Sequence, residues 1–65
     1  MIRVIIRDEE NPEEDLWSGN MSFIPREGEM VFFSAFYGKV ANVNHVFDDP
    51  TLPPGHVVTI YIHLE

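Results

Sequence analysis

The segment of residues 57–64 alternates strictly between two kinds of side chain, and this pattern is typical of an extended strand. One face carries only aliphatic residues, namely Val58, Ile60, Ile62 and Leu64. The other face carries Val57, Thr59, Tyr61 and His63. A period of two in β-branched residues indicates a strand that packs on one side. We therefore expect a strand here, with its second face half-exposed.

Other segments repeat this signal. Residues 2–7 alternate with Ile2, Val4 and Ile6 on one side. Residues 30–33 are a third strand candidate, and a tight connection at 34–36 leads into a longer strand over 37–47. The alternative places the turn at Gly38-Lys39. Residues 25–29 are expected as a turn, and residues 48–55, rich in proline, as a rigid loop.

Four or five short strands without a helical period predict an all-β fold, as an antiparallel sheet or a small closed barrel. Closure would protect hydrophobic edges such as residues 30–33 from aggregation. The 65 residues suffice for one domain, 1–65, and contain no cysteine, which excludes disulfides and cysteine-based zinc sites. So small a domain needs a very well packed core or a second copy of itself.

The strongest charge feature is the run over residues 8–15. Six of these eight residues are acidic: Asp8, Glu9, Glu10, Glu13, Glu14 and Asp15. With Pro12 in its middle, the run predicts a long solvated acidic loop over 8–21, with at most one helical turn at 12–17. Its role is either to keep the domain soluble or to attract a basic partner. The ligand spacing of an EF-hand calcium loop is missing.

The overall balance of 11 acidic against 4 basic residues gives a net charge of −7. Such a charge repels phosphate backbones and anionic lipids. We therefore expect a protein partner of basic character, no direct nucleic-acid binding and no membrane association. No apolar run is long enough to span a bilayer, and the N-terminal stretch is too short for a signal peptide. The expected location is the cytoplasm, or the host-cell cytoplasm for a phage protein.

Three motifs carry a family resemblance: Pro25-Arg26-x-Gly28-Glu29-x-Val31, Gly38-x-Val40-x-x-Val43-x-His45 and Val58-x-Ile60-x-Ile62. Together they resemble small SH3-like barrels over residues 23–64, above all the compact barrels of bacteria and their phages. The likeness to KOW-type modules is weaker. The resemblance implies an SH3-like barrel of four to five strands and no particular ligand, since such barrels serve many functions.

Aromatic residues supply the second half of a candidate binding surface. Tyrosine and tryptophan are frequent interface anchors, and the candidates are Trp17, Phe36, Tyr37 and Tyr61. The alternative is that these rings cover the barrel ends as part of the core. Residues 30–33 and 36–37 also hold more apolar side chains than one strand face can bury, which favours an interface with another protein or a second copy.

Catalytic and metal-binding patterns are missing from the chain. His45, His56 and His63 have no metal-ligand spacing, although His45 and His63 can be cross-strand neighbours near Asp48 or Asp49. No nucleophile motif or phosphate-binding glycine loop occurs. We therefore expect no enzyme, no metal and no cofactor.

Three functions remain compatible with these features. The leading hypothesis is an interaction module that binds a basic protein through the acidic loop and the adjacent aromatics. The second is an inhibitor encoded by a phage or mobile element that mimics nucleic-acid charge. The third is a structural component of a virion or a homo-oligomer.

Overall fold

The computed structural model describes all residues, 1–65, and the fold is all-β, as expected. Its five strands are β1 (Ile2–Asp8), β2 (Asn11–Met21), β3 (Met30–Phe32), β4 (Tyr37–Phe47) and β5 (His56–Leu64). There is no helix, and so none that is long and apolar enough to cross a membrane. The predicted strands over 2–7, 37–47 and 57–64 are confirmed.

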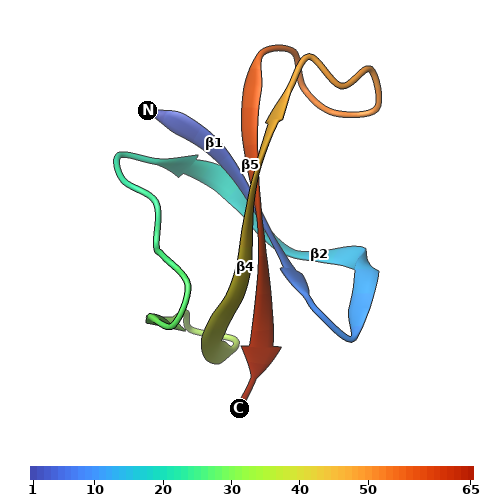
Figure 1. Cartoon of the computed structure of the whole chain (residues 1–65). Coiled ribbons are helices and arrows are strands. Elements are labelled where there is room, and N and C mark those ends of the chain that lie inside the picture. The colour runs from blue at the N-terminus through green and yellow to red at the C-terminus, as the bar shows by residue number, and fades with distance from the viewer.

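All five strands belong to one strongly twisted sheet, in the order β2-β1-β5-β4-β3 (Figure 1). Three of the four pairs are antiparallel, whereas β1 and β5 run parallel, from Arg3 beside Val57 to Asp8 beside Ile62. The prediction of a purely antiparallel sheet is therefore wrong. The alternation of side chains along a strand shows which face of the sheet each residue occupies. Parallel and antiparallel strands share this alternation, so it does not reveal the direction of a strand relative to its neighbour.

The sheet curls into a half-barrel and does not close. β2 and β3 form its two edges and are not paired with each other. The expectation of a closed barrel without edges is therefore not met. The concave side holds the main core, made of Val4, Ile6, Val31, Val40, Val58, Ile60 and Ile62. These residues come from four of the five strands, so the curl itself creates the interior.

On the convex side of the two inner strands Ile5, Val57 and Thr59 are buried as well, whereas Tyr61 is half-buried and His63 is exposed, in agreement with the half-exposed face predicted for residues 57–64. Val57 is 1%, Thr59 4% and Ile5 4% exposed. Each of the strands β1 and β5 has a neighbour on both sides, so flanking side chains cover these positions. Continuous apolar runs such as Val4–Ile6 are typical of strands buried on both faces.

The predicted acidic loop over 8–21 is largely a strand. Residues 11–21 form β2, which pairs with β1 from Asp8 beside Asn11 to Ile2 beside Met21. The helical turn at 12–17 does not form. Register shifts on either side of Arg7 accommodate the pairing. An edge strand tolerates both Pro12 and exposed carboxylates, because one of its sides faces water.

The connection between β3 and β4 lies at residues 33–36, where the Phe33 amide donates to the Phe36 carbonyl at 2.8 Å. The alternative turn at Gly38-Lys39 is wrong. Gly38 is buried inside β4, opposite Leu64, and a Cβ there would collide with the main-chain carbonyl of His63. Glycine at 38 thus permits the close approach of β4 and β5.

We predict that Gly38→Ala lowers the free energy of unfolding by about 2–3 kcal/mol, because the methyl group meets backbone that cannot move aside easily. The matched substitution Ser34→Ala, at an exposed position in the adjacent turn, should change it by less than about 0.5 kcal/mol. Urea unfolding followed by circular dichroism measures both. Equal stability of the two variants would contradict the close approach.

The loop over residues 48–55 is organised by Asp49. Its Oδ1 accepts hydrogen bonds from the Thr51 hydroxyl at 2.7 Å and from the Thr51 amide at 2.8 Å. These two bonds stabilise the carboxylate and hold the pKa of Asp49 below its ordinary value, and the bond from the hydroxyl has the larger effect. Asp48 and Gly55 have φ angles of 54° and 90°, which aspartate tolerates and glycine favours.

We predict that Asp49 titrates below its ordinary pKa, and that Thr51→Val raises this pKa by removing the hydroxyl donor. Because the folded state favours the carboxylate, this interaction contributes stability above the ordinary pKa. It is lost as pH falls through the lowered one. Carbon-detected NMR titration of the Asp49 carboxyl measures the shift. An unchanged pKa of Asp49 in the Thr51→Val variant would show that the Thr51 hydroxyl does not stabilise the carboxylate.

Candidate functional site

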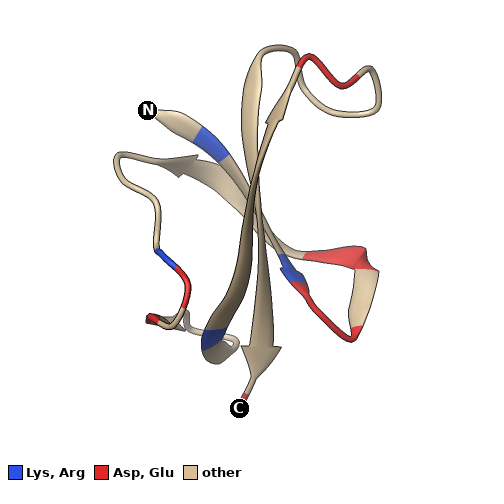
Figure 2. Ribbon diagram, in the orientation of Figure 1, with Lys and Arg blue, Asp and Glu red and all other residues tan.

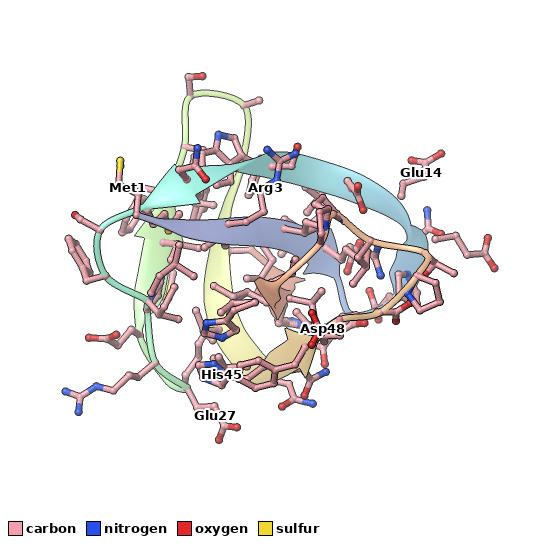
Figure 3. All side chains as sticks on the ribbon, turned by 90° about the horizontal axis from the view of Figure 1, so that it is seen from above. Met1, Arg3, Glu14, Glu27, His45 and Asp48 are labelled. Carbon is pink, nitrogen blue, oxygen red and sulfur yellow. The ribbon has the colours of Figure 1, made fainter.

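Six of the 11 acidic residues lie on the hairpin formed by β1 and β2, and the others are spread over the rest of the chain (Figure 2). β1 ends at Asp8, whose Oδ1 accepts a hydrogen bond from the Glu10 amide at 3.0 Å. An aspartate that binds the backbone two residues later is a common way to build a tight turn. The hairpin thus begins with a structural carboxylate, and Glu14 on its second arm projects outward (Figure 3).

Two of the six acids on this hairpin have a basic partner. The Arg7 Nε donates to Asp15 Oδ1 at 2.8 Å, and His63 Nδ1 lies 2.9 Å from Glu9 Oε2. The hydrogen bond with Asp15 is the main reason that the pKa of Arg7 is raised, and the nearby Tyr61 side chain adds to it. Asp8, Glu10, Glu13 and Glu14 form no ion pair. The hairpin therefore keeps a negative potential that no internal cation cancels.

A hollow of about 490 Å³ opens beside this hairpin on the convex face of the sheet. It is lined by Glu9, Pro12, Ala41, Asn42, Asn44 and Tyr61. Tyr61 lies in the central strand β5, in register with Arg7 of β1 and Asn42 of β4. A carboxylate, an aromatic ring and two amides in one hollow are groups that bind a guanidinium or an ammonium.

The four aromatic residues predicted as one binding surface lie in three separate places. Trp17 and Phe36 are half-buried on the concave side, where Phe33 links their rings at centroid distances of 5.4 and 4.8 Å. Both rings pack against the core, as the alternative interpretation has it. Tyr37 stacks on Phe32 on the convex side, 5.5 Å between centroids. Of the four aromatic residues, Tyr61 is the one that lines the hollow beside the acidic hairpin.

The histidines lie at opposite ends of the sheet. His45 Nδ1 is 2.9 Å from His56 Nε2, and the His56 ring also stacks on Phe47. His63 instead contacts Glu9, so the expected pairing of His45 with His63 is wrong. His45 lies beside Val58, whereas His63 lies beside Lys39. Nowhere do three histidine or acidic side chains gather closely enough to hold a metal ion.

Two further hollows lie away from the acidic hairpin. One, of about 580 Å³, separates the segment 24–29 from β4 and includes His45. The other, of about 390 Å³, is mostly apolar and lies between the 33–37 turn and the C-terminal Leu64. Neither of these hollows is lined by a residue of the acidic hairpin.

Pro12, Asn42 and Asn44 line the hollow but were not among the site residues predicted from the sequence. A signal for the two asparagines exists in the alternation of residues 42, 44 and 46, which places them on one face of the predicted strand. What could not be read from the sequence is the pairing of that strand with Tyr61, because it depends on the register of β4 against β5 and on the shift between Val40 and Asn42.

We predict that Trp17→Ala destabilises the fold by about 2–3 kcal/mol, because the ring fills part of the core and lies over Gly19. Tyr37→Ala, which removes an exposed ring, should cost at most about 1 kcal/mol. Thermal and urea unfolding of the two variants separate the roles. A larger loss for Tyr37→Ala would reverse the assignment.

Comparisons with protein-family models, with curated proteins and with solved structures find no match to this chain. The resemblance to SH3-like barrels therefore stays a prediction, and the functional argument depends on the residues of the site alone.

Proposed function

We propose that this chain is a non-enzymatic interaction module that binds a basic segment of a partner protein. The segment lies along the β1–β2 hairpin and places one arginine or lysine side chain in the hollow next to Tyr61. The observation that carries the proposal is the position of Glu9 and Tyr61 in a hollow that adjoins four unpaired carboxylates.

Electrostatics favours such a partner at two ranges. At 4 Å, opposite unit charges attract by about 1 kcal/mol in water and by about 4 kcal/mol near a protein surface. The unpaired acids also attract a basic partner before contact, which raises the association rate at low ionic strength. A cation over the Tyr61 ring adds about 0.5–1 kcal/mol at an exposed site. The net charge of −7 disfavours acidic partners over the whole surface.

The relation to SH3-like barrels is part of the proposal. Five strands, a curled sheet and a long first hairpin support it. An experimentally determined structure of a homologous chain with an established family would test it.

The test of the proposed function is a titration with a synthetic arginine- and lysine-rich peptide, measured by calorimetry at several salt concentrations. We expect the triple variant Glu10→Gln, Glu13→Gln and Glu14→Gln to bind at least about 10-fold more weakly at low salt, a loss of about 1.4 kcal/mol. Affinity of the unaltered chain should fall as salt rises, because exposed charges are screened.

A matched control separates the hairpin from the total charge. Glu27→Gln, Asp48→Asn and Glu65→Gln remove the same number of charges at positions without ion pairs and outside the hairpin. This control should bind within about 3-fold of the unaltered chain, a difference of less than 0.7 kcal/mol. Equal weakening by both triple variants would refute a specific hairpin site.

A second arm tests the hollow. Tyr61→Leu should weaken binding by about 3-fold or more, whereas Tyr61→Phe, which keeps the ring, should not. If a nucleic acid of matched length competes for the same surface of a natural partner, the charge-mimic hypothesis gains support. Simultaneous binding of both to that partner excludes it.

A further inference from the structure

The edge strand β3 presents unpaired backbone groups to solvent. β3 pairs only with β4, in a register that joins Met30 to Lys39 and Phe32 to Tyr37. The flanking bonds from the Val40 amide to the Glu29 carbonyl and from the Phe33 amide to the Phe36 carbonyl, both 2.8 Å, show which residues face β4. Because alternate residues point to the same neighbour, the N–H and C=O groups of Met30 and Phe32 face the open edge.

The side chains at this edge are apolar and exposed. Phe32 is 72%, Tyr37 46% and Met30 43% exposed, and the rings of Phe32 and Tyr37 stack on each other. We name these three residues the β3 patch. All three lie on the convex face, because Met30 and Phe32 are in register with Lys39 and Tyr37 on the side opposite the buried Val31.

The other edge of the same sheet is protected. β2 carries Pro12 and the charged residues 13–15, and these are the features with which natural proteins prevent strand addition. β3 has neither a proline nor a charge within Met30–Phe32. The sheet thus has one edge that is protected over residues 12–15 and one edge without such protection.

We propose that the open edge pairs with the same edge of a second copy, so that the chain forms a two-fold symmetric dimer through β3. In the antiparallel register, Met30 lies opposite Phe32 of the second copy and Val31 lies opposite Val31 at the dyad. The outward groups of Met30 and Phe32 then form four hydrogen bonds between the two strands. The β3 patches of both copies meet on the convex face, and the two half-barrels join into one ten-stranded sheet.

A second copy fits this edge better than another occupant for two reasons. First, the outward backbone groups are arranged symmetrically about Val31, which is the self-complementarity that a two-fold interface needs. Second, the strand order places the acidic hairpin at the opposite edge from β3. The curl of the sheet brings Trp17 of β2 to 5.4 Å from the Phe33 ring on the concave side, whereas the β3 patches of the two copies meet on the convex face, away from that contact.

The dimer also leaves the proposed recognition site free, so the two proposals stand or fall separately. The hollow beside Tyr61 lies on the far side of β4 from β3. β3 itself is only 3 residues long, so the interface is at the small end of the range for specific complexes. We therefore expect a dissociation constant of micromolar order or weaker, about 10⁻⁶ to 10⁻⁴ M.

The experiment is sedimentation equilibrium of the full chain from about 10 μM to 1 mM, a range that spans the expected dissociation constant. The unaltered chain should pass from monomer to dimer, and Phe32→Lys should raise the dissociation constant at least about 10-fold, since an edge lysine prevents strand pairing. Phe23→Lys is the matched control, because Phe23 is 76% exposed and lies outside β3. It should change the constant by less than about 3-fold.

Both lysine variants reduce the net negative charge equally, so a loss of dimer in Phe32→Lys alone does not come from general repulsion. A covalent test fixes the register. The chain has no cysteine, and Val31→Cys places two thiols at the dyad, where directly opposite residues without mutual hydrogen bonds approach closely enough for a disulfide. Ser34→Cys should not cross-link under the same mild oxidation.

A strict monomer at 1 mM would overturn the proposal. So would a dimer that Phe32→Lys leaves intact, or one that cross-links through Ser34→Cys rather than through Val31→Cys. Circular dichroism of each variant verifies that the exposed substitutions leave the fold unchanged. Binding of the basic peptide by the monomeric Phe32→Lys variant would further show that recognition does not depend on dimer formation.

Discussion

The parallel pairing of β1 with β5 is the interaction on which the rest of the molecule depends. It joins the two ends of the chain along six register positions, from Arg3 and Val57 to Asp8 and Ile62. Both strands lie inside the sheet and supply five of the seven core residues. Each then carries an antiparallel neighbour, β2 on one side and β4 on the other. Without this pair, the β1–β2 hairpin separates from the three-stranded sheet of β3, β4 and β5, and an isolated hairpin is marginally stable in water.

This arrangement produces two edges of opposite character. β2 exposes a proline and carboxylates to solvent, whereas β3 exposes Met30 and Phe32. On the concave side, the rings of Trp17, Phe33 and Phe36 pack against the core. The convex face carries the hollow beside Tyr61 toward one edge and the β3 patch at the other. Glu9 and His63 form a pair between these two areas.

Side-chain alternation predicted the strands well, and it predicted their arrangement poorly. Residues 57–64 and 37–47 are strands because β-branched and aromatic residues fit a pleated surface, and this preference is local. The acidic segment was missed, because the repulsion among its carboxylates is weak in water while the pairing of Ile2, Val4 and Ile6 with β2 is a tertiary effect. The direction of β1 against β5 and the open edges depend on contacts between distant residues. Tyr61 was predicted as a site residue from its residue type. Asn42 and Asn44 belong to the site only because the register of β4 against β5 places them beside Tyr61.

The position of the acidic residues is itself an argument about their role. Carboxylates crowded on one hairpin repel one another, and only Asp15 and Glu9 have a basic side chain as a partner. A surface that serves solubility alone does as well with charges of both signs spread over it. Here four carboxylates without an ion pair lie close together on one hairpin, at the edge of the sheet and next to a hollow lined by an aromatic ring and amides. The repulsion within the hairpin falls when a cation settles beside it. A basic partner therefore stabilises the element that it binds, and this coupling is the physical basis for assigning recognition to the hairpin.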